Sequence, residues 1–107
     1  MKRGDLVTVA SSGDYGKPRP ALIVQADAYV EHPSLTVLPL TSELHDMPPT
    51  RITVEPGGGT GLRLRSQVMV DKVTTIPRAK AGTRIGQLDE AAMSGVSRAL
   101  AAFLGVG

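Results

Sequence analysis

Residues 13–24 of the chain read Gly13-Asp14-Tyr15-Gly16-Lys17-Pro18-Arg19-Pro20-Ala21-Leu22-Ile23-Val24. A polar loop with two glycines leads directly into a short apolar run, which is typical of a buried strand. Loops held by such strands often carry binding and catalytic side chains. Arg19 lies between two prolines, so its backbone loses little conformational freedom when the side chain meets an anion. These residues leave two interpretations open, a functional loop or an ordinary hairpin with a surface arginine.

The size and composition of the chain limit the function classes. A chain of 107 residues has room for one hydrophobic core, so we expect a single domain over residues 1–107. The sequence contains no cysteine, which excludes disulfides, thiolate metal sites and a cysteine nucleophile. It also lacks the roughly 20 consecutive apolar residues of a membrane span, and its charged start does not resemble a signal peptide. We therefore expect a cytoplasmic protein with no membrane partner.

Positive charge is concentrated in the second half of the chain. Residues 56–88 carry a net charge of +5, whereas the whole chain carries +2. Such a bias suits a phosphate backbone or an acidic protein partner, and a solvated basic surface is the alternative. The chain has only two tyrosines, one phenylalanine and no tryptophan, so a surface that stacks many bases is not expected.

Hydrophobic patterning predicts several short strands followed by one helix. We expect strands over residues 6–10, 20–26, 35–41, 51–55, 66–71 and 84–88. Pro39 falls inside the third strand and implies a strand edge or a bulge. After Asp89, which suits an N-cap, apolar residues recur at helical spacing until Gly105. This order favours a mainly β fold with a C-terminal helix, arranged as a small barrel or half-barrel.

Two other features of the sequence could be mistaken for sites. The stretch 56–61 holds four glycines but lacks the lysine and the hydroxyl group at a helix start that a phosphate-binding loop needs. We expect a flexible hairpin there. His32 and His45 lack ligand partners at the usual spacing, so no metal site is predicted. A catalytic role for His45 stays open because it lies near Thr41 in sequence.

Five short segments cover nearly the whole chain in a fixed order. They are Arg3-Gly4-Asp5, Gly16-Lys17-Pro18-Arg19-Pro20, Leu38-Pro39-Leu40-Thr41-Ser42, Gln67-Val68-Met69-Val70-Asp71-Lys72 and Ile85-Gly86-Gln87-Leu88-Asp89. This order resembles the MazF/PemK family of toxin endoribonucleases. The resemblance implies an SH3-like small barrel of the MazF, CcdB and Kid type. It also implies a homodimeric toxin of a type II toxin-antitoxin system that cleaves single-stranded RNA, or mRNA, in a sequence-specific way without metal or other cofactor. Its expected protein partner is an acidic antitoxin.

The same resemblance assigns roles to individual residues. Arg19 matches the family's catalytic arginine, and Thr41 matches the threonine after the third strand. A forked guanidinium and a hydroxyl donor suit the charge that builds on phosphorus when an RNA 2′-hydroxyl attacks it. The candidates for RNA contact are Asp14, Tyr15, Lys17, Ser42, Gln67, Asp71 and Lys72. Lysines can meet phosphates, Tyr15 can stack on a base and Gln67 can read a base edge. Gln67 and Asp71 could equally satisfy strand ends.

This chain departs from the family pattern at Met69. Plasmid-encoded relatives have an arginine where this chain has Met69, so a catalytic pairing of that arginine with Asp71 cannot be carried over.

Two alternative functions stay open. Toxins of the CcdB type share the barrel but bind DNA gyrase through a terminal Trp-Gly-Ile contact. This chain has no tryptophan and ends Leu104-Gly105-Val106-Gly107, which disfavours that function. The other alternative is a non-catalytic barrel that serves as a binding module.

Overall fold

Seven strands and one helix are found in the computed structural model, which describes residues 1–10, 17–47 and 49–107. The strands are β1 Asp5–Ala10, β2 Pro18–Ile23, β3 Ser34–Thr41, β4 Arg51–Val54, β5 Ser66–Met69, β6 Thr74–Pro77 and β7 Ala81–Gln87. Helix α1 spans Glu90–Leu104, and three 3-10 turns are η1 Asp27–Tyr29, η2 Val70–Lys72 and η3 Arg78–Lys80. The prediction of a mainly β fold with a C-terminal helix is confirmed.

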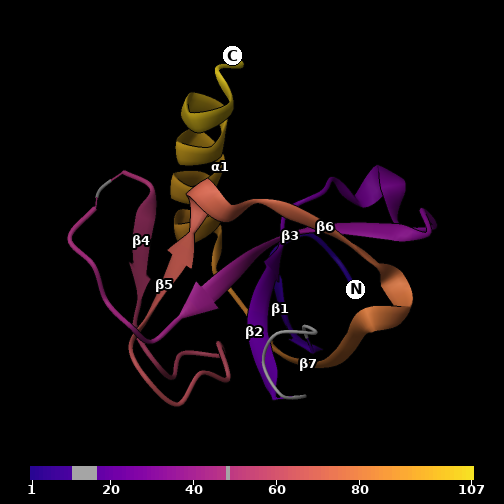
Figure 1. The fold of residues 1–107 in the computed structure, drawn as a ribbon, viewed down its shortest axis with the longest axis horizontal. Coiled ribbons are helices and arrows are strands. Elements are labelled where there is room, and N and C mark those ends of the chain that lie inside the picture. Colours follow the sequence, from indigo (N-terminus) through magenta and orange to yellow (C-terminus); the bar gives the residue numbers. More distant parts are fainter. Residues whose placement is uncertain (11–16, 48) are drawn as a thin grey trace.

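The long strand β3 organises the sheet, whose order is β4-β5-β3-β2-β1-β7 with β6 also paired to β3 (Figure 1). All these pairings are antiparallel, and β2 lies along one side of β3. On its other side, residues 34–37 pair with β6 and residues 40–41 pair with β5. Pro39 lies where this second ladder is interrupted, which suits a residue without an amide donor. Among the described residues no pairing joins β4 to β7, so the barrel is open.

Two apolar clusters lie on opposite faces of the central strands. Leu6, Leu22 and Leu38 belong to the cluster that also contains Val96 of α1. The residues that alternate with these leucines, among them Val7, Ile23 and Val37, form the second cluster, which β6 and β7 help to cover. Each fully buried side chain of this kind contributes about 1.5 to 3 kcal/mol relative to exposure. The alternation therefore fixes which face each side chain of β1, β2 and β3 occupies.

Helix α1 has the ends that the sequence predicts. The Asp89 carboxylate accepts a 2.8 Å hydrogen bond from the Ala92 amide, and Gly105 closes the helix with a left-handed backbone at φ +72°. Val96 is fully buried and fixes the helix to the core. No helix in the described part of the chain is long and apolar enough to cross a membrane.

Several elements differ from the sequence-based prediction. Strand β2 ends at Ile23 and not at residue 26, and β7 begins at Ala81 and not at residue 84. The expected strand over 66–71 ends at Met69, because residues 70–72 turn into η2. Strand β6 was not predicted, since its four residues include a proline and only Ile76 is partly buried, which gives no alternating pattern. It forms because the first half of β3 pairs with it.

The glycine-rich loop between β4 and β5 packs its backbone directly against β7. The Gln87 amide donates to the Gly59 carbonyl over 3.0 Å, and the buried Thr60 hydroxyl donates to the Gly57 carbonyl over 2.8 Å. Gly61 has a φ of +72°, and a Cβ atom there would lie 2.0 Å from the Ile85 carbonyl oxygen. The glycines therefore serve a close backbone approach. The hairpin connection is confirmed, and its attachment to β7 corrects the expectation of a flexible one.

The start of the chain is fixed by a buried carboxylate. Asp5 has a side chain only 4% exposed and accepts hydrogen bonds from the Lys2 amide at 2.8 Å and from Arg84 Nε at 3.1 Å. Burial alone would raise the pKa of Asp5, but the Lys2 hydrogen bond, the hydrogen bond and charge of Arg84 and the N-terminal ammonium outweigh it. Together they hold the pKa of Asp5 below its ordinary value.

Asp5 makes the stability of the fold depend on pH. Because its pKa is lowered on folding, its contribution is present above the ordinary pKa of aspartate and is lost as the pH falls through the folded value. We expect Asp5→Asn to reduce the free energy of unfolding at neutral pH by about 1 to 3 kcal/mol and to flatten the acid limb. Urea unfolding over a pH series measures both. An acid limb as steep as in the wild-type protein would contradict this role.

The close approach at Gly61 can be tested against a glycine of similar backbone conformation. Gly58 has a φ of +60°, but an added Cβ there would meet nothing within 4 Å. We expect Gly58→Ala to destabilise by about 1 to 2 kcal/mol from the left-handed backbone alone. Gly61→Ala adds overpacking and should cost roughly 3 kcal/mol or more in urea unfolding. Equal losses in the two variants would show that contact with β7 is unimportant.

Candidate functional site

Arg19 and Thr41 come from neighbouring strands and meet at one end of the sheet. Strand β2 pairs with β3 so that Ala21 lies opposite Pro39, and Arg19 and Thr41 each lie two residues beyond this pair. Both residues line the same two cavities. Arg19 is exposed and Thr41 is partly buried as the last residue of β3. The structure therefore brings together the two residues that the sequence singles out for catalysis.

Two cavities flank this pair. The larger, of about 540 Å³, and the smaller, of about 410 Å³, share four lining residues, namely Arg19, Pro20, Leu40 and Thr41. Ser42 and Ser66 also line the larger cavity, and the Ser66 hydroxyl donates to the Leu64 carbonyl over 2.9 Å. Met69 and Ile76 line only the smaller one. Arg19 and Thr41 thus form a ridge between the two cavities.

The Thr41 hydroxyl is oriented by its own chain. The Glu43 amide donates a 3.1 Å hydrogen bond to Thr41 Oγ1, so one lone pair of the hydroxyl oxygen is occupied. A threonine hydroxyl keeps its hydrogen for a separate donor interaction. The arrangement leaves Thr41 able to donate to an anion at the ridge.

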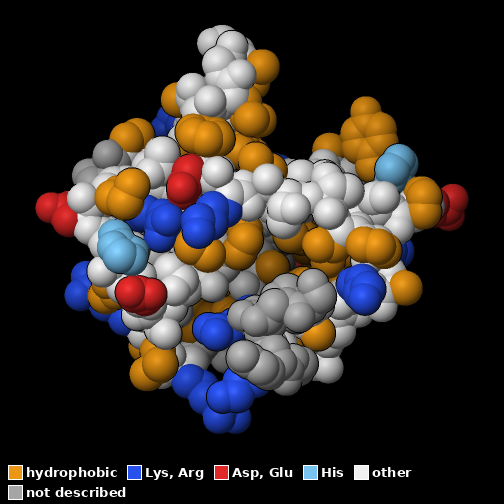
Figure 2. Space-filling view, viewed as in Figure 1, with side chains coloured by type: hydrophobic (Ala, Val, Ile, Leu, Met, Phe, Trp, Pro, Cys, Tyr) orange, Lys and Arg blue, Asp and Glu red, His pale blue; other side chains and the backbone are white. Residues whose placement is uncertain are grey.

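The β4–β5 loop forms a wall of the larger cavity and carries a cation into it. Gly61, Leu62, Arg63 and Leu64 line this wall, opposite Thr8 and Arg19. In Figure 2, Lys and Arg side chains gather at the lower edge of the molecule, where Figure 1 shows this loop. Two arginines, Arg19 and Arg63, therefore line this cavity.

Several cations of the basic segment 56–88 have partners within the protein. Arg65 Nε lies 3.0 Å from Glu55, and Arg84 Nε lies 3.1 Å from Asp5. Arg78 donates to the carbonyl of His32 over 2.7 Å. These contacts occupy half of the six cations of the segment, and of the six only Arg63 lines the larger cavity.

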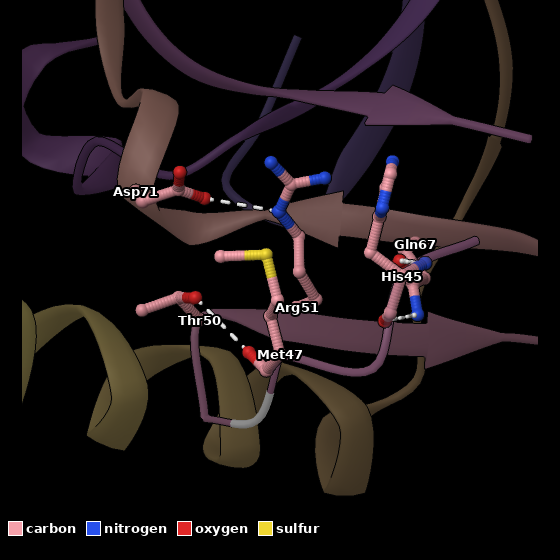
Figure 3. Close-up of polar contacts among 6 residues, drawn as sticks. All are labelled: His45, Met47, Thr50, Arg51, Gln67 and Asp71. Atoms are coloured by element: carbon pink, nitrogen blue, oxygen red, sulfur yellow. Dashed lines mark hydrogen bonds and ion pairs between the residues drawn. The ribbon is translucent and has the colours of Figure 1, made fainter. Parts of the chain in front are cut away.

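Gln67 and Asp71 have partners inside the protein, shown in Figure 3. Gln67 is 6% exposed, and its amide exchanges two hydrogen bonds with the backbone of His45. Asp71 accepts from Arg51 Nε over 3.1 Å, and their side chains are 26% and 9% exposed. Neither Gln67 nor Asp71 lines the two cavities at Arg19.

The other predicted contacts are distributed unevenly. Ser42 lines the larger cavity, while Lys17 precedes β2 and Lys72 lies in η2, both exposed and outside the cavity linings. Asp14 and Tyr15 lie outside the described residues.

The histidines do not gather with other possible metal ligands. His32 Nδ1 accepts from the Ser34 amide over 3.2 Å, and His45 Nε2 lies 3.9 Å from Glu43. Within the described ranges, no three His, Cys, Asp or Glu residues are grouped to hold a metal ion.

Sequence reasoning missed Arg63 and Arg51 as individual residues. Leu62-Arg63-Leu64-Arg65 alternates apolar and basic residues beside the glycines. Leu62 is buried but Leu64 is 62% exposed, so this alternation does not identify Arg63 as a residue of the cavity wall. The sequence gives no local indication that Arg51 forms an ion pair, because its partner Asp71 is 20 positions away.

Comparison with known proteins identifies the family. A sequence profile of PemK-like, MazF-like toxins of type II toxin-antitoxin systems matches residues 2–104. A probable endoribonuclease MazF of Mycolicibacterium smegmatis is 48% identical over 107 residues, which cover 99% of this chain and 98% of that protein.

Solved structures agree with this match. A mycobacterial endoribonuclease in complex with its cognate antitoxin has a TM-score of 0.84 at 25% identity, over 100% of this chain and 97% of that one. The Mycobacterium tuberculosis toxin MazF-mt6 has a TM-score of 0.79 at 25% identity, over 95% and 98% of the two chains. The chain described here belongs to the PemK-like, MazF-like toxins of type II toxin-antitoxin systems.

Proposed function

We propose that this toxin is an endoribonuclease that cleaves single-stranded RNA, including mRNA, at specific sequences without a metal ion. The relative that is 48% identical is named a probable endoribonuclease, which supports the activity. The observation that carries the proposal for the site is the meeting of Arg19 and Thr41 on a ridge between two cavities.

The chemistry of this pair suits transesterification of RNA. The 2′-hydroxyl oxygen attacks the adjacent phosphorus and loses its proton, the bond to the 5′-oxygen breaks, and that oxygen takes up a proton. The products are a 2′,3′-cyclic phosphate and a 5′-hydroxyl end. Arg19 can hold two phosphate oxygens with its fork, and the Thr41 hydroxyl can donate to a third. Donors placed where negative charge develops stabilise the transition state.

The two cavities suggest a path for the RNA strand. We infer that the scissile phosphate lies on the ridge and that the nucleotides on either side enter the larger and the smaller cavity. Ser42 and Arg63 would contact the strand in the larger cavity. Lys17 and Lys72, which do not line either cavity, remain proposed contacts. Asp14 and Tyr15 also remain proposed contacts and lie outside the described residues. Gln67 and Asp71 are weaker candidates, because each has a partner within the protein.

The same family match supports the proposed partners. The mycobacterial endoribonuclease was solved with its cognate antitoxin, so we propose a cognate antitoxin of acidic character for this chain. The net charge of +2 on the toxin chain is complementary to such an acidic partner. We further propose that the toxin acts as a homodimer in the cytoplasm. The family match disfavours the alternatives of a gyrase poison and a non-catalytic module.

Arg19→Ala should reduce the cleavage rate by at least ~10²-fold, the scale expected for the loss of one charge-stabilising donor. The assay uses purified protein, a mixed-sequence single-stranded RNA and excess chelator, with the product ends mapped. Arg98→Ala is the matched control, because Arg98 is an exposed arginine of α1 bonded to Ser94, away from the ridge.

Three results would contradict this proposal. Undiminished cleavage by folded Arg19→Ala would remove the role of Arg19. Activity of the wild-type protein that disappears in chelator would remove metal independence. If the folded wild-type protein leaves RNA intact both in chelator and with added metal, the result would favour gyrase inhibition or a non-catalytic binding function.

Arg63 should contribute to RNA affinity more than Arg65, which lies on the same loop but is paired with Glu55. Binding of a non-cleavable 2′-deoxy strand can be measured over a salt series. We expect Arg63→Ala to weaken binding and to lower the salt slope by about 0.7, the value for one phosphate contact on a single strand. Arg65→Ala should leave the slope nearly unchanged. Equal slopes in both variants would exclude a phosphate contact by Arg63.

A further inference from the structure

Gln67 lies on β5, the strand between β4 and β3, and is the pairing partner of Thr41. In strand β5 it pairs with Thr41 of β3 on one side and with Thr53 of β4 on the other. Its side chain is only 6% exposed. A buried amide must satisfy both its donor and its acceptor, so the partners that it finds show what it holds in place.

The Gln67 side chain holds the segment that follows Thr41. Its Oε1 accepts from the His45 amide over 2.9 Å, and its Nε2 donates to the His45 carbonyl over 2.8 Å (Figure 3). The same segment supplies the Glu43 amide that donates to Thr41 Oγ1. Gln67 therefore holds both ends of this segment. Its backbone pairs with Thr41 across the strands, and its side chain bonds the His45 backbone.

We infer that Gln67 is a positioning residue for the Thr41 hydroxyl. By holding His45, it keeps the Glu43 amide on Thr41 Oγ1, and this directs the remaining hydroxyl hydrogen towards the phosphate on the ridge. The inference rests on the proposed function and revises the expectation that Gln67 reads a base edge. With one donor and one acceptor of its amide used inside the protein, Gln67 acts on RNA through Thr41.

The chain offers a matched control for this role. Gln25 Oε1 accepts from the Thr36 amide over 3.0 Å, and Gln25 Nε2 donates to the Tyr29 carbonyl over 3.3 Å. This amide thus also bonds two backbone groups, but it contacts neither cavity at Arg19. Gln67→Met and Gln25→Met remove the same chemistry at two places, one of which is linked to Thr41.

The experiment measures RNA cleavage, the KM, the site preference and the hydrogen exchange of the His45 amide. Gln67→Met should lower kcat by ~10-fold or more, as expected for a misplaced catalytic group. Its KM and cleavage preference should stay as in the wild-type protein, and the His45 amide should lose protection. Gln25→Met should change none of these. If Gln67→Met does not fold, Gln67→Asn replaces it, because the shorter amide cannot reach both His45 groups.

A combined variant separates action through Thr41 from direct contact. If Gln67 works only through Thr41, Thr41→Ala with Gln67→Met should have the kcat of Thr41→Ala alone. Independent, multiplying losses, a raised KM or an altered cleavage preference would overturn the inference in favour of RNA contact. Wild-type kcat in folded Gln67→Met would also overturn it while leaving the proposed function intact. Failure of the proposed function itself would instead appear as a wild-type protein that cleaves no RNA.

Discussion

The register between β2 and β3 is the constraint on which the site depends. Ala21 pairs with Pro39, and Ile23 pairs with Val37. Successive buried residues of both strands alternate between the two apolar clusters, so a slip by one position would turn every side chain of a strand to the wrong face. The register that fills both clusters leaves Arg19 and Thr41 each two residues beyond the Ala21–Pro39 pair, where both line the same two cavities. Packing of the core thus sets the geometry of a site that itself lies at the surface.

Folding brings together charged residues that are far apart in the sequence. Asp5 and Arg84 are 79 positions apart, and Arg51 and Asp71 are 20 apart, yet each pair joins across strands. The net charge of residues 56–88 favours a basic surface, but the individual cations of this segment have different contacts in the structure. Arg65, Arg78 and Arg84 bond to groups of the protein, whereas Arg63 lines the cavity beside Arg19. Local sequence cannot distinguish these cases, because the partner of each cation is decided by strand order and loop path.

The sequence predicts those elements whose signal is local. The buried run Ala21–Val24 and the capped helix after Asp89 follow from periodicity and end residues alone. The proximity of Arg19 and Thr41 could be expected only from family resemblance. Strand β6 and the Gln67 contact with His45 had no local signal, since both depend on a distant strand. The glycines of the β4–β5 loop could be recognised as lacking a phosphate-loop context, but their contact with Ile85 and Gln87 is visible only in three dimensions.

The central claim is that Arg19 and Thr41 act together on one phosphate. A double-mutant cycle tests it most directly, with cleavage rates for wild-type protein, Arg19→Ala, Thr41→Ala and the double variant on the same RNA in excess chelator. Residues that act as a unit give losses that do not multiply, so the double variant should be little slower than the slower single variant. Losses that multiply fully would mean that the two residues act independently, and the ridge would not be a shared phosphate site.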